Sequence, residues 1–255
     1  LGREGPSIQL GAAMGQGFSK VFKRPKIEEK FLITGGASAG LAAAFNAPLA
    51  GMIFALEEVH KNFSPLILLA AASAALTGDL VSKEFFGINP VLNFRELPVM
   101  PLSNYMYLIF LGFITGLTGV LFNYTLLKTQ DLYGLIKFIP IRFRLAIPFL
   151  AACLMGLFLP QVQGGGHDLI VSMVKDNFFI GTLIVLLLAK FVFTMVSFGS
   201  GAPGGIFLPM LAIGAIIGNL YGNIITNIFN LNMDFKNNFI ILAMAGYFTA
   251  VVRAP

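Results

Sequence analysis

The chain opens on Gly2-Arg3-Glu4-Gly5-Pro6, and an apolar run rich in small residues follows this stretch. A proline that comes after flexible polar residues is typical of the first turn of a helix. The start of a helix exposes unpaired backbone N–H groups and a partial positive charge, so it attracts an anion. Glu4 stands where such an anion would bind. We therefore expect this carboxylate to compete with a dissolved anion for one site, which the rest of the chain holds inside a membrane.

The composition of the chain is that of a membrane protein. Hydrophobic residues make up 56% of the 255 residues and charged residues only 11%, against about 25% charged residues in an average soluble domain. The 28 glycines and 13 prolines are tolerated in membrane helices, where neighbouring helices satisfy the freed backbone groups. An unusually apolar soluble helical protein is the alternative. The sequence predicts a multi-pass protein of the cell membrane that contacts lipid.

The net charge of +5 comes from basic residues that are scattered through short connecting segments. Lys20, Lys23, Arg24 and Lys26 form one local patch, which suits a loop facing the membrane surface. This scatter argues against nucleic acid as a partner. Cys153 is the only cysteine, so an internal disulfide is excluded.

Apolar runs of helical length follow one another and predict an all-α protein. They lie at 4–19, about 30–44, about 48–61, 65–86, 103–127, 145–159, about 167–176, 178–198 and 238–252, and uncharged residues also run from Pro209 to Met233. We expect a loop at 87–101 and a short connection at 128–137. The spacing of Gly11 and Gly15 allows close approach of a neighbouring helix.

Residues 31–56 carry no charge but are interrupted at Phe45-Asn46-Ala47-Pro48. The residue before a proline is biased away from helix, so this run predicts two shorter helices joined by an irregular segment. An irregular segment at membrane depth must be buried in protein or line a cavity.

The two ends of the chain resemble each other. Gly2-Arg3-Glu4-Gly5-Pro6 parallels Gly205-Ile206-Phe207-Leu208-Pro209, and in both a glycine lies four residues before a proline and another five after it. Ala47-Pro48 and Ala254-Pro255 follow at similar distances along the chain. Many transporters are built from such repeats, with helix N-termini aimed at an anion near the midplane. The sequence predicts two related halves and leaves their relative orientation open.

These motifs resemble the CLC family of chloride channels and chloride/proton antiporters, of prokaryotic type. The resemblance also rests on Gly204 and on Glu57-Glu58 after Phe45-Asn46-Ala47-Pro48-Leu49-Ala50-Gly51, and it runs over essentially the whole chain. It implies an all-α membrane fold of tilted and broken helices in two inverted repeats. It also implies a homodimer in which each subunit has its own pore.

The resemblance also implies how the chain is divided. Residues 1–101 would hold the later helices of the first transmembrane repeat, and residues 102–255 most of the second. The chain reads as a fragment, because the family's Ser-containing anion segment would lie before Leu1 and its late Tyr after Pro255.

Two carboxylates carry the functional prediction. Glu4 resembles the family's gating glutamate, and Glu58 resembles the internal proton-transfer glutamate of its antiporters. An ordinary acid in a first helical turn is the alternative for Glu4, and a helix-end acid paired with His60 or Lys61 is the alternative for Glu58. Channels of the family usually lack a glutamate at this second position, so the resemblance favours exchange over passive conduction.

The backbone N–H groups of Ile206 and Phe207 are expected to bind the anion, because the glycines before them let the backbone approach it closely. Packing at a helix start is the alternative for both residues. The resemblance extends the lining of the site to Gly2, Arg3, Gly5, Gly205 and Leu208.

Other chemistries have little support in the sequence. It shows no Ser/His/Asp or Cys/His set, phosphate loop or dinucleotide fingerprint, so we expect no enzymatic activity and no cofactor. Glu57 and His60 lack a third ligand, so we expect no metal. Lys190 is expected to snorkel or to face a polar interior, and His167 to lie in a loop or at a helix cap.

The predicted function is transport of chloride across a membrane, with chloride and protons as the transported ions. Ionised Glu4 blocks the anion path and protonated Glu4 leaves it, while Glu58 passes protons to it from the cytoplasmic side. A passive voltage- or pH-gated chloride channel and a transporter of nitrate or fluoride are the alternatives.

Overall fold

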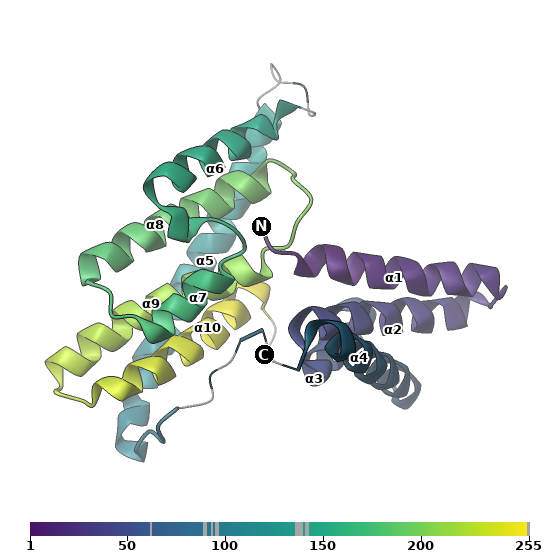
Figure 1. The fold of residues 1–255 in the computed structure, drawn as a ribbon, viewed down its shortest axis with the longest axis horizontal. Helices are drawn as coiled ribbons and strands as arrows, with labels where there is room; N and C mark the ends of the chain where they lie inside the picture. The colour runs from purple at the N-terminus through teal and green to yellow at the C-terminus, as the bar shows by residue number, and fades with distance from the viewer. Residues whose placement is uncertain are drawn as a thin grey trace. The chain divides into compact units, whose positions relative to one another are not determined.

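The computed structural model describes residues 1–61, 63–88, 91–92, 94, 97–135, 140 and 143–253, and every named element in them is helical. The longer elements are α1 (Glu4–Val21), α2 (Lys26–Phe45), α3 (Pro48–Phe54), α4 (Pro65–Phe86), α5 (Met106–Leu135), α6 (Ala146–Phe158), α7 (His167–Lys175), α8 (Ile180–Gly199), α9 (Phe207–Ile228) and α10 (Lys236–Val252) (Figure 1). Within the described residues, five helical segments are long and apolar enough to cross a membrane. The prediction of an all-α membrane protein is confirmed.

The chain forms two compact units. One comprises Arg3–Asn93, with helices α1 to α4, and the other comprises Leu1–Gly2 and Phe94–Pro255, with helices α5 to α10. This division falls near the predicted boundary between residues 101 and 102. That the units are the two transmembrane repeats stays a prediction. Within the predicted loop at 87–101, Asn89, Pro90, Asn93, Arg95 and Glu96 lie outside the described residues.

In the first unit, α1 lies beside α2 (Figure 1), and glycines bring the two backbones together. A Cβ at Gly11 would collide with the carbonyl oxygen of Gly36, and a Cβ at Gly15 would collide with that of Leu32. The close approach predicted from the spacing of these two glycines is confirmed.

An alanine at Gly11 is expected to destabilise this helix pair. Its methyl group has no room against Gly36, and overpacking of this kind costs about 1–3 kcal/mol. We expect a lower midpoint of thermal unfolding for the full-length protein in detergent. Gly17→Ala is the matched control, because a Cβ there meets nothing within 4 Å in the same helix. Equal midpoints for the two variants would show that the contact is unimportant.

The predicted break after Phe45 is confirmed. Asn46 adopts a left-handed conformation (φ 52°, ψ 42°) as it ends α2, and α3 begins at Pro48. The second predicted helix, 48–61, differs from the prediction in one respect. Its final part, Ala55–His60, is a π-helix, which carries Glu57 and Glu58.

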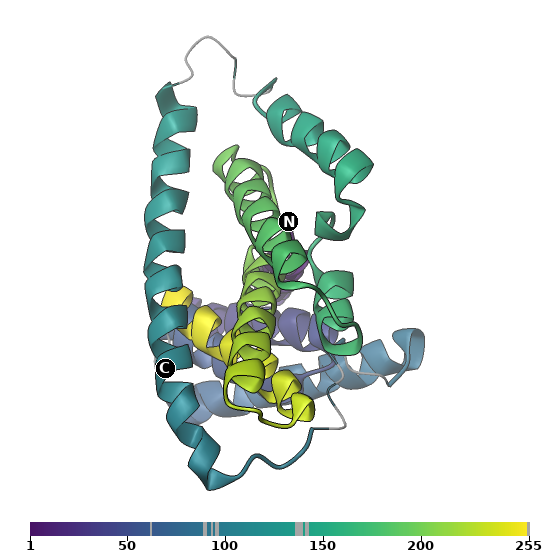
Figure 2. The same ribbon diagram turned by 90° about the vertical axis from the view of Figure 1, so that its left-hand side faces the viewer.

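Helix α5 is longer than predicted. The sequence predicts a helix at 103–127 and a connection at 128–137, but the helix runs from Met106 to Leu135 and stands as one continuous rod in Figure 2. The added turns are held by α8, because the Tyr133 hydroxyl donates a hydrogen bond to the Val196 carbonyl at 3.0 Å. The charges after residue 127 therefore mark the end of the apolar run and not the end of the helix.

Helix α9 is the centre of the second unit. The most apolar 18-residue stretch of α9 is 83% buried, whereas the corresponding stretches of the other described long apolar helices are 22–39% buried. A helix that is apolar on all sides belongs in an interior. The core around it comprises Phe122, Leu126, Met195, Met210, Ile213, Ile217, Tyr247 and Val251.

The contact between α9 and α10 repeats the contact between α1 and α2. A Cβ at Gly214 would crowd Met244, and a Cβ at Gly218 would crowd Ile240, both on α10. Gly214 and Gly218 stand at the same distances along the chain from Gly205 as Gly11 and Gly15 do from Gly2. The sequence repeat is therefore also a repeat of helix packing.

The ends of these helices match as well. The residues before α1 and α9, Arg3 and Ile206, have similar backbone angles (φ −88°, ψ −7° and φ −102°, ψ 1°). Asn46 after α2 and Arg253 after α10 both adopt the left-handed conformation. Ala254-Pro255, the second half of the later repeat motif, lies outside the described residues.

Candidate functional site

The two glycines that the sequence repeat aligns meet in the second unit. The Gly2 N–H donates to the Gly205 carbonyl at 2.6 Å, and the Gly205 N–H donates to the Gly2 carbonyl at 2.8 Å. Together they form an isolated antiparallel bridge. Motifs that are 203 residues apart in the sequence thus share one pair of backbone hydrogen bonds.

A helix begins two residues after each bridging glycine. Glu4 is the first residue of α1 and Phe207 is the first residue of α9. Normal helical bonding starts at once, because Ser7 N donates to the Arg3 carbonyl at 3.0 Å and Met210 N to the Ile206 carbonyl at 2.9 Å. The first N–H groups of any helix point away from its own carbonyls and carry partial positive charge. Both helix starts therefore offer the chemistry that an anion requires.

Glu4 is a buried carboxylate. Its side chain is 2% exposed, and neither carboxylate oxygen accepts a hydrogen bond from the residues that the structure describes. Burial of an unpartnered carboxylate is costly, and native structures rarely contain one without a functional reason. A first-turn acid that only supports its helix would remain in water, so the burial weakens the structural alternative for this residue.

The side chains of Ile206 and Phe207 pack into the protein. Ile206 lies against the core around α9, and the Phe207 ring meets the Phe248 ring edge-on at 4.8 Å. Leu208 is also buried. Apolar packing, the alternative for the first two side chains, therefore occurs, and anion binding by their backbone groups stays a prediction.

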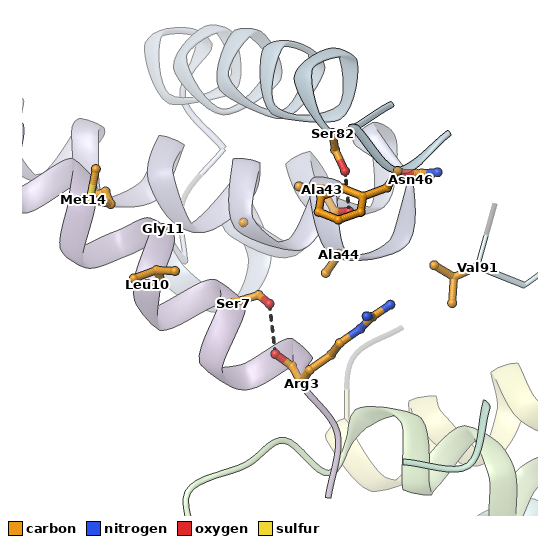
Figure 3. Close-up of a pocket in the computed structure, with 12 residues that line it drawn as sticks. Arg3, Ser7, Leu10, Gly11, Met14, Ala43, Ala44, Asn46, Ser82 and Val91 are labelled. Carbon is orange, nitrogen blue, oxygen red and sulfur yellow. Dashed lines mark hydrogen bonds between the residues drawn. The ribbon is translucent and has the colours of Figure 1, made fainter. Parts of the chain in front are cut away.

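Arg3 lines a groove of the first unit (Figure 3). Ser7 comes to the same groove from α1, Asn46 from the end of α2, and Ser82 from α4. The Ser7 hydroxyl donates to the Arg3 backbone carbonyl at 3.0 Å. The Arg3 side chain is exposed, so its charge can act on an approaching anion. Gly5 follows within the first turn of α1.

Glu57 and Glu58 lie half-buried in the π-helix Ala55–His60. His60 contacts Thr34 instead of an acid, with 3.1 Å between its Nδ1 and the Thr34 Oγ1. Within the described part of the chain, no ion pair joins Glu58 to His60 or Lys61. π-Helical turns are rare and occur frequently at functional sites. This conformation, which the sequence did not predict, singles out the pair of acids.

Lys190 faces a polar interior and does not snorkel. It is 1% exposed in α8, and its Nζ donates to the carbonyls of Val162 at 2.9 Å and Gly164 at 3.0 Å. His167, predicted in a loop or at a cap, is the first residue of α7 after the cap Gly166. A lone lysine in an apolar run and a triple glycine are visible in the sequence, but only the fold brings them together.

Broken helices, the Gly2–Gly205 bridge and five described segments able to cross the bilayer define a multi-pass integral membrane protein with a buried ionisable residue. Such residues in membrane proteins mark ion pathways. The chain belongs to the voltage gated chloride channel family, whose model matches residues 1–255. The resemblance seen in the sequence and the broken-helix fold that it implied are confirmed.

Individual relatives are consistent with this assignment. The chain is 37% identical over 264 residues to the H(+)/Cl(−) exchange transporter ClcA of Vibrio cholerae serotype O1, and the match covers 100% of this chain and 56% of the relative. It is 37% identical over 262 residues to the ClcA of Klebsiella pneumoniae, of which 55% is covered. The chain thus spans about half the length of the curated relatives it matches.

Solved structures give the same result. The crystal structure of a slow cyanobacterial Cl⁻/H⁺ antiporter is similar with a TM-score of 0.89 and 31% identity, over 100% of this chain and 60% of that chain. A CLC-type fluoride/proton antiporter is similar with a TM-score of 0.77 and 26% identity, over 98% of this chain and 61% of that chain.

Proposed function

We propose that the protein containing this chain exchanges chloride for protons across the cell membrane. The observation that carries the proposal is a buried carboxylate, Glu4, which has no hydrogen-bond partner among the described residues and follows Gly2 of the Gly2–Gly205 bridge by two residues. Relatives named as H(+)/Cl(−) exchange transporters and a similar Cl⁻/H⁺ antiporter structure support it. Chloride and protons are the transported ions, and the protein requires no cofactor for this activity.

The anion site is built on the backbone. The N–H groups of Ile206 and Phe207 at the start of α9 bind the chloride, as the helix dipole favours. The glycines on either side keep side chains away from the ion, and the Arg3 guanidinium adds a positive field. The residues that line this site are Gly2, Arg3, Gly5, Gly205 and Leu208.

Glu4 is the gate of this site. Two residues of extended chain span at most about 7 Å, so the connection from Gly2 keeps Glu4 near the bridge whatever the path of α1. The ionised carboxylate occupies the place of a chloride ion. The protonated carboxyl has no charge to hold it there and leaves the path open. Each cycle therefore links one protonation of Glu4 to the passage of anions.

Glu58 delivers the proton from the cytoplasmic side. It belongs to the same unit as Glu4, and its half-buried position in a π-helix gives it contact with both protein and water. The protein functions as a homodimer in contact with lipid, each subunit having its own pore, as the family resemblance implies.

The similarity to a fluoride/proton antiporter gives a second candidate substrate, fluoride. The full-length protein should be reconstituted in liposomes and its flux measured with chloride, nitrate and fluoride in turn. We expect chloride to be carried faster than fluoride. A fluoride flux faster than the chloride flux would show that fluoride, and not chloride, is the preferred substrate. A reversal potential that does not depend on the pH gradient would favour a passive channel.

A further inference from the structure

Lys190 is a buried cation whose contacts the transport mechanism does not yet use. Its ammonium group donates to two backbone carbonyls, those of Val162 and Gly164. Among the residues that the structure describes, no carboxylate forms an ion pair with it. Both acceptors are neutral, so the charge of Lys190 is not cancelled locally, and burial in a medium of low dielectric extends its reach.

The loop that Lys190 holds packs against the glycine bridge. A Cβ built at Gly165 would lie 3.6 Å from the Cα of Gly2 and 3.5 Å from the nearest side-chain carbon of Leu208. The next residue, Gly166, lies against Ala212 of α9 and the Lys190 side chain, with its own Cβ position 3.4 Å from the Lys190 Cε. The loop therefore contacts both the Lys190 side chain and residues of α9.

This arrangement brings the charge close to the anion site. One peptide unit and one van der Waals contact separate the Lys190 ammonium from Gly2, a separation of roughly 11 Å at most by standard bond lengths. At that distance inside a protein, a charge that is not cancelled still acts on an anion. Every residue in this chain of contacts belongs to the second unit.

We propose that Lys190 is a positioning residue of the anion site. It fixes the Gly164–Gly166 loop against Gly2 and Leu208, and its charge raises the affinity of the site for chloride. This inference rests on the proposed function, because it concerns the same site. Loss of the ammonium group removes both effects, since Val162 and Gly164 each lose a hydrogen bond and the anion loses a nearby positive charge.

The test compares Lys190→Met with Lys236→Met in the full-length protein. Lys236 is a matched control, because it is also buried (6% exposed) and donates to a neutral oxygen, that of Asn177, at 2.7 Å. Chloride affinity is measured by titration calorimetry in detergent, and turnover by chloride flux from liposomes. We expect Lys190→Met to raise the Kd for chloride about tenfold and Lys236→Met to change it less than about twofold.

Lys190→Arg separates the charge from a merely structural role. Arginine keeps the positive charge but places it on a larger, planar group. If Lys190 acted only through its packing, arginine would therefore not restore chloride binding. We expect this variant to bind chloride within about threefold of the wild type. A folded Lys190→Met protein that binds chloride as the wild type does would overturn the proposal.

A second variant keeps the proposal testable if Lys190→Met does not fold. Gly165→Leu should push on Gly2 and Leu208 and raise the Kd for chloride, whereas Gly181→Leu should not, because a Cβ at Gly181 meets nothing within 4 Å. Equal chloride affinity in both glycine variants would overturn the proposal. If wild-type protein neither binds nor carries chloride, the proposed function fails instead, so the two failures are distinguishable.

Discussion

A Glu4→Gln protein is expected to carry chloride and to move no protons. Glutamine has nearly the shape of glutamic acid, but it takes up no proton and carries no charge. It therefore resembles the protonated gate at every pH. The measurement is proton uptake by liposomes along a chloride gradient, recorded beside chloride efflux. Proton uptake should fall below detection, while chloride efflux should stay within about tenfold of the wild type.

The same variant should lose its dependence on pH. In the wild type, chloride flux should decrease as the pH rises, because a larger fraction of Glu4 is ionised and occupies the anion site. With glutamine at this position the flux should be constant over the same pH range. Glu28→Gln is the control, since Glu28 is an exposed acid whose Oε2 lies 3.7 Å from the Arg24 Nε, and this variant should behave as the wild type. Proton uptake that survives in Glu4→Gln would remove Glu4 from the gate.

Glu58→Gln should separate the two fluxes in a different way. Chloride should still cross, because the gate and the anion site are intact, but protons should no longer reach the gate from the cytoplasmic side. We expect proton flux to fall at least about a hundredfold, the usual effect of removing a proton-transfer group. Because Glu4 is still present, the chloride flux of this variant should keep its dependence on pH.

Glu57→Gln provides the matched control for this second variant. Glu57 lies in the same π-helical segment and is also half-buried, so both substitutions remove one charge from the same turn. Proton flux in Glu57→Gln should stay within about twofold of the wild type. If both variants lost proton flux equally, the turn as a whole and not Glu58 would control proton delivery. Unchanged proton flux in Glu58→Gln would exclude the proposed route.

Local signals in the sequence predicted the elements on which the site is built. Glycine and proline fixed the start of α1, and the Phe45-Asn46-Ala47-Pro48 segment fixed the break between α2 and α3. The sequence repeat aligns Gly2 with Gly205, and these two residues form the bridge. Such features depend on backbone preferences of single residues, which the sequence states directly.

Other features depend on contacts between distant segments, and the sequence could not supply them. Helix α5 extends beyond the charge at Lys128 because Tyr133 is held by α8. The carbonyl partners of Lys190 lie in a loop 26 and 28 residues away along the chain. The π-helix that contains Glu58 differs from an α-helix in its hydrogen-bond register. This difference does not alter the pattern of apolar residues in the sequence.

The central claim is that one carboxylate, Glu4 at the start of α1, couples chloride to protons. The most direct test is to record chloride and proton fluxes in the same liposomes, with an outward chloride gradient and no initial pH gradient. For the wild type we predict chloride efflux accompanied by proton uptake in a fixed ratio, and for Glu4→Gln we predict chloride efflux alone. Chloride efflux without proton movement in the wild type, or coupled proton uptake in Glu4→Gln, would contradict the claim.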